Sequence, residues 1–313
     1  MTIKVFYSPQ LNNVDKRSRI PTEQKAKEFV TALGWEPDVS YHGLVNAYPY
    51  FTGTTIDYAK GLLRKVHSAA YFDNAKPGWG TLNNALAHNI TLFKACEYAA
   101  EHGIAFAPVS GFHHAGYDYG WGFCTYNGLV AAALQKQGRV LILDGDQHFG
   151  DGTLDILNKL NLHDKITNYS IKEWDDIPDF EGYDHIIYQA GADAHYLDGG
   201  YLNDETWVQR DEIVFQKAKD YNVPITVTFA GGYSSLQKVV DLHLSTYWTA
   251  TRIYYERTHE GCQDIVGELS GAINAARRGE AADVPAWARL ALFGEYPGTY
   301  GAGQRPRFHR YQE

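Results

Sequence analysis

The stretch Arg139–Thr153, R-V-L-I-L-D-G-D-Q-H-F-G-D-G-T, contains the pattern from which the fold of this chain can be inferred. Its segment Val140–Leu143 is a continuous run of apolar, mostly branched residues, which is typical of a strand buried on both faces of a parallel sheet. A tight turn through Gly150 and Gly152 follows, and a helix is expected over 151–160. The stretch therefore predicts one strand–turn–helix unit of an α/β fold.

The same alternation of strand and helix extends along the chain in both directions. Further strands are predicted at 3–7, 104–109, 166–171, 184–189 and 223–229. Further helices are predicted at 21–34, 55–71, 82–102, 129–134, 202–222, 238–255, 269–277 and 285–292, whereas 35–54 reads as a long loop. We therefore expect residues 1–313 to form a single α/β domain, with a mostly parallel central sheet flanked by helices on both faces.

The composition and net charge of the chain indicate which kinds of molecule it can bind and in which cellular setting it is expected. The net charge is −9, from 28 basic and 37 acidic side chains, which disfavours direct binding of nucleic acid and suits a basic peptide segment better. Three cysteines are too few for a disulfide framework, so a reducing, cytoplasmic setting is expected, with a nuclear or secreted-effector location left open. Neither a secretory signal nor an apolar run long enough to span a membrane is expected.

Asp144, Asp146 and His148 follow the central strand at every second position. While the backbone stays extended, side chains with this spacing point to the same side of the strand. Two carboxylates and one imidazole suit a divalent metal, and catalytic zinc sites typically combine three protein ligands with a water molecule. The alternative for this stretch alone is an acidic turn with a solvated histidine, because short motifs often match by chance.

Polar or reactive side chains follow the other predicted strands as well. They are His113 and His114 after 104–109, Ser170 near the end of 166–171, Asp193 after 184–189 and Gly231-Gly232-Tyr233 after 223–229. In parallel α/β sheets, ligands bind beyond the carboxyl ends of the strands. We therefore expect these residues to surround one site, with the glycine-flanked Trp121 and Phe123 at the rim of its pocket.

Taken together, these motifs resemble the zinc-dependent histone deacetylases. The matching segments are G-F-H-H-A (111–115), G-F-C (122–124) with Asn127, D-G-D-Q-H-F-G-D-G (144–152), G-A-D (191–193) and G-G-Y (231–233). Their order and spacing match over roughly residues 80–245, and R-D-E (210–212) with V-P-I (223–225) makes the second half most similar to the class IV branch. The resemblance implies the arginase/deacetylase fold.

The resemblance also implies roles for individual residues. Asp146, His148 and Asp193 would bind Zn²⁺, or Fe²⁺, because two carboxylates and one imidazole select weakly among these ions. The implied catalytic residues are the pair His113 and His114, their orienting carboxylates Asp144 and Asp151, and Tyr233, which would hydrogen-bond the substrate carbonyl. His114 would act as general base and then as general acid.

Two further groups of residues follow from the same resemblance. Phe123 would form one wall of an acyl-lysine tunnel, with Gly122 and Gly232 beside it. A structural K⁺ ion would be held by Asp144, Asp146, His148, Ser170 and Ile171, several of them through main-chain carbonyls. Phe149 stands where many relatives have a second histidine, and we expect this difference to change packing only.

The activity implied is hydrolysis of the amide of N6-acetyl-lysine, or of a longer acyl-lysine, in proteins, with histone tails among the candidate substrates. A small-molecule amidohydrolase, such as an acetylpolyamine deacetylase, is the alternative enzyme. Two further candidates are a catalytically silent acyl-lysine reader and a two-manganese ureohydrolase. His195 lies at the offset where related arginases place a second-metal aspartate, but Gly150 occupies the partner position, which favours a packing or rim role for His195.

Overall fold

A parallel β-sheet forms the centre of the computed structural model, which describes residues 3–12, 24–34, 44–46, 52–78 and 80–255. Its seven strands follow the order β2-β1-β3-β7-β6-β4-β5, and every neighbouring pair is parallel. The strands are β1 (Lys4–Tyr7), β2 (Leu44–Asn46), β3 (Ile104–Ala107), β4 (Val140–Asp144), β5 (Ile166–Ser170), β6 (His185–Gln189) and β7 (Ile225–Thr228). The predicted α/β class with a parallel sheet is therefore confirmed.

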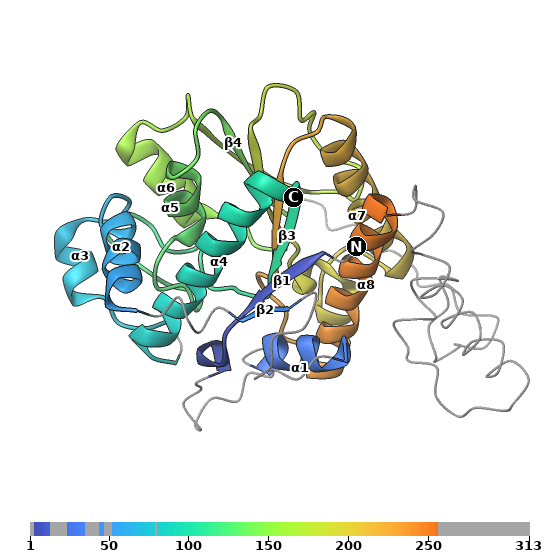
Figure 1. The fold of residues 1–313 in the computed structure, drawn as a ribbon, viewed down its shortest axis with the longest axis horizontal. Helices are drawn as coiled ribbons and strands as arrows, with labels where there is room; N and C mark the ends of the chain where they lie inside the picture. Colours follow the sequence, from blue (N-terminus) through green and yellow to red (C-terminus); the bar gives the residue numbers. More distant parts are fainter. Residues whose placement is uncertain (1–2, 13–23, 35–43, 47–51, 79, 256–313) are drawn as a thin grey trace, which may run out of the picture.

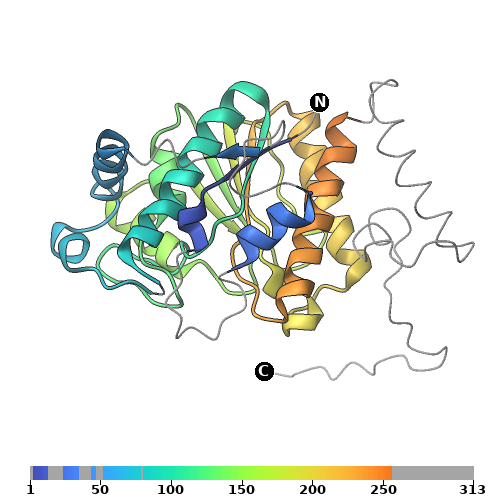
Figure 2. The same cartoon turned by 60° about the horizontal axis from the view of Figure 1, so that its bottom comes forward.

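Helices cover both faces of this sheet (Figures 1 and 2). They are α1 (Lys25–Ala32), α2 (Gly53–Leu63), α3 (Ala69–Asn74), α4 (Leu82–His102), α5 (Gly128–Leu134), α6 (Asp151–Leu160), α7 (Asp204–Asp220) and α8 (Leu236–Tyr255). Helices α4, α5 and α6 lie on one face, and α1, α7 and α8 lie on the other. On the second face, the ring of Phe106 in β3 contacts Phe215 of α7 and Tyr247 of α8.

The middle strands are buried throughout, as continuous apolar runs require in a sheet covered on both faces. Every residue of β3, β4, β6 and β7 is buried. His185 in β6 is a polar exception, and its Nε2 lies 3.0 Å from Thr226 Oγ1 on the adjacent strand. This contact pairs two polar groups inside the core.

The carboxyl ends of the central strands lie level with one another. Asp144 at the end of β4 is in register with Ser170 of β5 and with Gln189 of β6. Gln189 is in turn in register with Thr228 of β7. The loops that follow these strands therefore emerge along the same edge of the sheet, where ligands bind in open α/β sheets.

The structure corrects two features expected from the sequence. The predicted loop 35–54 contains β2, a strand of only three residues that depends on pairing with β1. The predicted helix 55–71 is interrupted, because Ser68 caps the separate helix α3 by accepting the Tyr71 N–H.

The helices expected at 269–277 and 285–292 lie outside the described residues, and a single domain over 1–313 stays a prediction. Within the described ranges, no helix has the length and apolarity needed to cross a membrane.

Candidate functional site

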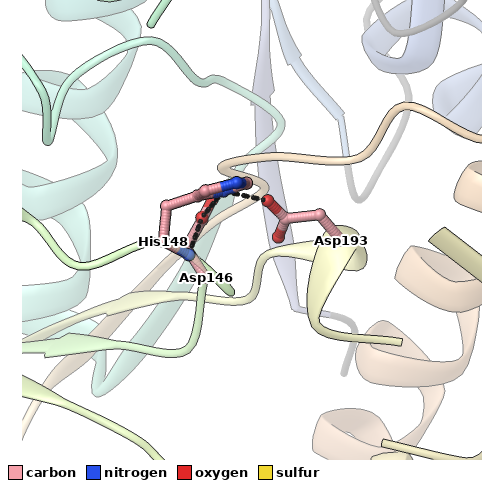
Figure 3. Close-up of side chains that lie close together, drawn as sticks. All are labelled: Asp146, His148 and Asp193. Atoms are coloured by element: carbon pink, nitrogen blue, oxygen red, sulfur yellow. Dashed lines mark hydrogen bonds and ion pairs between the residues drawn. The ribbon is translucent and has the colours of Figure 1, made fainter. Parts of the chain in front are cut away.

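Three potential metal ligands converge at the carboxyl edge of the sheet (Figure 3). Asp146 and His148 come from the turn after β4, and Asp193 comes from the short helix η4 (Ala192–Ala194) after β6. One ligand atom from each residue lies within 4.8 Å of the others. His148 Nδ1 is 3.2 Å from Asp146 Oδ1 and 3.0 Å from Asp193 Oδ2, so the three side chains point toward one centre.

Main-chain donors hold the two carboxylates in place. The N–H groups of His148 and Gly231 donate to Asp146 at 2.9 and 2.7 Å, and the Gln147 N–H donates to Asp193 at 3.2 Å. A Cβ atom at position 231 would lie 2.3 Å from Asp193 Oδ2 and 2.7 Å from Asp146 Oδ2. Glycine is therefore needed there for the backbone to approach both carboxylates.

The electrostatics of this triad suit a cation. Asp146 and Asp193 are buried, and burial together with the charge of Asp146 raises the pKa of Asp193 to about 7. Hydrogen bonds to both carboxylates raise the pKa of His148 to about 10. The pKa of Asp146 is lowered, so this carboxylate stays ionised and its charge disfavours ionisation of Asp193; a divalent ion there would neutralise both. The residues present therefore fit a metal centre.

The two adjacent histidines lie beside the triad, each with its own carboxylate. His113 Nδ1 is 2.9 Å from Asp144 Oδ2, and His114 Nδ1 is 2.6 Å from Asp151 Oδ1. Their rings lie 4.0 Å apart, and the main-chain carbonyl of His113 accepts the Thr153 N–H from α6. In both residues the Nδ1 contact leaves Nε2 as the nitrogen available for other chemistry.

The environments of these histidines shift their pKa values in opposite directions. Burial lowers the proton affinity of His113, but the charges of Asp144 and Asp146 outweigh it and raise the pKa to about 9. Burial and the neighbouring His113 lower the pKa of His114, although Asp151 opposes them. His113 is thus the member of the pair that carries a proton at neutral pH, whereas His114 is the one able to accept a proton.

Tyr233 and Phe123 both line the pocket that Asp146 of the triad also lines. Their ring centroids are 5.8 Å apart, and both rings are partly exposed. Burial and the charges of Asp146 and Asp193 raise the pKa of Tyr233, so its phenol stays protonated. The residues that line the pocket include Lys25, His113, Gly122, Phe123, Asp146, Gln189, Gly231, Gly232 and Tyr233.

A family comparison agrees with this arrangement. The family described as the histone deacetylase domain matches residues 22–177. This chain belongs to the histone deacetylase family. The matched range contains the histidine pair and Asp146, while Asp193 and Tyr233 come later in the chain and reach the same site through the parallel sheet.

Curated relatives of this deacetylase-family chain share modest identity with it. Histone deacetylase 2 of Arabidopsis thaliana is 27% identical over 192 residues, which cover 47% of this chain and 49% of that protein. Histone deacetylase B of Dictyostelium discoideum is 29% identical over 143 residues, which cover 43% of this chain and 33% of that protein. An uncharacterized protein of Picosynechococcus sp. is 28% identical over 197 residues, which cover 50% of this chain and 66% of that protein. The chain thus spans from a third to two thirds of the lengths of these relatives, and the class IV likeness stays a prediction.

The residues expected to hold K⁺ lie close to one another around the end of β4. The Ile171 N–H donates to the Asp144 main-chain carbonyl at 2.8 Å, and Ser170 is in register with Asp144. Ser170 Oγ is buried and has no hydrogen-bond partner among the described residues. An ion or water beside Ser170 would satisfy this oxygen, and the K⁺ assignment stays a prediction.

Phe149 and His195 are the two positions at which the chain departs from the pattern of its relatives. Phe149 is 52% exposed, so its ring is not enclosed by the core, and the expectation that this difference changes packing only stays a prediction. His195 is fully buried against Trp207, with its Nε2 3.0 Å from Asp204 Oδ1. Among the described residues His195 is not part of the metal-ligand group, in agreement with a packing role.

Sequence reasoning missed two residues that contribute to the pocket. Lys25 of α1 is buried and donates to the main-chain carbonyl of Ala230, next to the metal triad. Asp198 accepts the main-chain N–H of Tyr233 and so holds the loop that presents the phenol. A lysine on the apolar face of α1, beside Ala26 and Phe29, was the available signal for Lys25, whereas no local pattern marks Asp198.

Proposed function

We propose that this chain hydrolyses the amide of N6-acetyl-lysine, or of a longer acyl-lysine, in proteins, with histone tails as one candidate substrate. The proposal rests mainly on one observation. Asp146 of the triad that fits a metal and the protonated phenol of Tyr233 line one pocket. The His114–Asp151 pair, in which the pKa of His114 is lowered, lies directly beside it, because the His114 ring is 4.0 Å from the pocket-lining His113. These are the groups that hydrolysis of a stable amide requires: a polarised carbonyl, a base for water and a stabilised oxyanion.

Asp146, His148 and Asp193 would hold the metal, which we propose to be Zn²⁺, with Fe²⁺ as the alternative. When bound there, a divalent ion would polarise the scissile carbonyl and lower the pKa of a nearby water molecule. The main-chain donors at Gly231 and Gln147 keep the aspartates oriented toward this position. Outer hydrogen bonds of this kind orient metal ligands in proteins.

His114 is the proposed general base. Asp151 binds its Nδ1, so Nε2 can accept a proton from water and later return it to the departing lysine amine. In the metal-free protein, the charges of Asp144 and Asp146 raise the pKa of His113, which makes His113 a poorer base than His114 at neutral pH. Its positive charge, fixed by Asp144, would instead favour negative charge that develops on the substrate.

Tyr233 would donate its phenolic proton in a hydrogen bond to the substrate carbonyl oxygen. Its raised pKa keeps this donor available across the physiological range. Phe123, with Gly122 and Gly232, would line the passage for the acyl-lysine side chain, since all three border the pocket. The acidic net charge of −9 suits basic segments that flank a lysine in a protein substrate.

The decisive experiment compares kcat/KM for an acetyl-lysine peptide, longer acyl-lysine peptides and N-acetylspermidine. We expect an acyl-lysine peptide to be the fastest substrate, and His114→Ala to abolish its hydrolysis. Faster cleavage of N-acetylspermidine would replace this proposal with a small-molecule amidohydrolase. Peptide binding without turnover by the metal-loaded wild-type protein would instead identify a silent reader, and two metal ions per chain would favour a ureohydrolase.

A further inference from the structure

Trp121 makes two separate contacts with the proposed base and its carboxylate. Its indole Nε1–H donates to Asp151 Oδ2 at 2.9 Å, while Asp151 Oδ1 binds His114 Nδ1 at 2.6 Å. Its ring also lies over His114, with centroids 4.2 Å apart and an interplanar angle of 35°. The indole therefore occupies the second oxygen of the carboxylate and covers one face of the imidazole.

The backbone around Trp121 is shaped to hold the indole there. A Cβ atom at Gly120 would lie 2.3 Å from Tyr71 Oη and 2.7 Å from the main-chain oxygen of Cys124. Gly122 has a positive φ of 54°, and a Cβ there would lie 2.5 Å from His114 Cδ2. Glycine at 122 therefore lets the backbone run against the His114 ring, and glycine at 120 lets it pass close to Tyr71 and Cys124.

Core packing does not explain this placement, because Trp121 is 53% exposed. A tryptophan side chain combines an apolar ring with one N–H donor, so a half-exposed indole can be held in place by its ring contact and its hydrogen bond together. Its donor atom and its inner face both contact the His114–Asp151 pair. A carboxylate bound at both oxygens loses rotational freedom, and so it presents Oδ1 to His114 in a single orientation.

We propose that Trp121 is a positioning residue that fixes the orientation of the His114–Asp151 pair. The kinetic part of this inference rests on the proposed function. Trp121→Phe retains a ring over His114 and removes the N–H donor. This substitution should lower kcat by about three- to tenfold and leave KM within about twofold of the wild-type value. The expected loss is small beside the roughly 10²–10⁴-fold rate increase that a proton-transfer group supplies, because His114 itself is retained.

A double-mutant cycle separates this role from a purely structural one. If Trp121 acts through Asp151, then Trp121→Phe should change kcat by less than about twofold in an Asp151→Asn background. Trp248→Phe on α8 is the matched control for loss of a tryptophan, and it should leave kcat unchanged in both backgrounds. Equal losses from Trp121→Phe in both backgrounds, or a rise in KM alone, would overturn the inference.

Proton NMR tests the same contact without any turnover. The signal of the His114 Nδ1–H hydrogen bond should broaden or disappear in Trp121→Phe, while that of His113 Nδ1–H, bonded to Asp144, should persist as an internal control. The Trp121 indole N–H resonance should shift in Asp151→Asn. Unchanged His114 and indole signals would refute the positioning role. A wild-type protein that cleaves no acyl-lysine peptide would refute only the proposed function, because these signals report the contact directly.

Discussion

The main-chain N–H of Gly231 donates to Asp146 Oδ2 at 2.7 Å, which ties the loop after β7 to the metal-ligand turn after β4. Tyr233 lies two residues beyond Gly231 in the same loop, and its own N–H is held by Asp198. One hydrogen bond thus links the position of a proposed ligand to the position of the proposed oxyanion donor. Disturbing residue 231 should therefore affect metal binding and catalysis together.

Gly231→Ala should lower both metal content and activity. The new Cβ would lie 2.3 Å from Asp193 Oδ2, a separation at which one of the two groups must move. Gly61→Ala in α2 is the matched control, because a Cβ there meets nothing within 4 Å and alanine favours a helix interior by roughly 0.5–1 kcal/mol. Elemental analysis and peptide hydrolysis on both variants would check this. Full metal content in Gly231→Ala would contradict the expectation.

Asp146→Asn and Asp193→Asn should each reduce metal content along with activity. Each substitution removes a negative charge from the group that fits the ion, and neutral amides bind Zn²⁺ more weakly than carboxylates do. Asp220→Asn, an exposed position at the end of α7, is the control and should leave metal content unaltered. Normal occupancy in both ligand variants would show that the triad is assigned wrongly.

Metal affinity should rise with pH, more steeply below pH 7 than above it. In the metal-free protein His148 binds a proton below a pKa of about 10, and Asp193 binds one below a pKa of about 7. Metal binding must displace these protons, so one is released between about pH 7 and 10 and two are released below pH 7. The apparent affinity should then change by about tenfold per pH unit in the first range and by up to about a hundredfold in the second.

Calorimetric titration with Zn²⁺ in buffers of different ionisation enthalpy would count the released protons. We expect about one proton per ion at pH 8.5 and nearly two at pH 6. An identical proton count at the two pH values would mean that Asp193 does not titrate in this range. The Asp220→Asn variant should behave as the wild-type protein does.

Tyr233→Phe should lower kcat by about 10²–10³-fold and change KM little, because the phenol is proposed to act on the developing oxyanion. Since the pKa of Tyr233 is raised, its ionisation should not limit activity on the alkaline side of the pH–rate profile. Tyr58→Phe is the control, because that tyrosine is exposed on α2 and its hydroxyl donates to Gln135 at 3.2 Å, outside the pocket lining. A large rise in KM with unchanged kcat would assign Tyr233 to substrate binding alone.

Local sequence signals were sufficient for most of the secondary structure. Helix α4 begins and ends as expected, because Thr81 and Asn84 form a capping box and Gly103, with φ of 90°, ends the helix. The central strands were recognisable as short apolar runs between polar turns. Strand β2 was missed because its pairing with β1 depends on the folded sheet and leaves no local pattern.

The candidate site was foreseeable to the extent that parallel strands place their carboxyl ends together. His114, Asp146, Asp193 and Tyr233 directly follow strands or lie in the loops just beyond them, so topology alone brings them to one edge. Lys25 reaches the same pocket from α1, whose position depends on packing against α8. Contacts of that kind follow from tertiary structure, and spacing along the chain does not reveal them.

Removal of one partner from the buried pair Arg210 and Asp211 of α7 should strongly destabilise the fold. Arg210 lies 4.0 Å over the Trp207 ring and 2.9 Å from Asp211 Oδ1, and Asp211 also accepts hydrogen bonds from Tyr188 Oη and Thr246 Oγ1. Arg210→Met leaves a buried carboxylate without its cation, so it should lower the free energy of unfolding by about 3–5 kcal/mol.

Arg252→Met is the control: it breaks the more exposed pair with Glu212 and should lower the free energy of unfolding by less than about 1 kcal/mol. Urea denaturation of both variants would measure the difference, and equal midpoints would show that the buried network contributes no more than a surface ion pair.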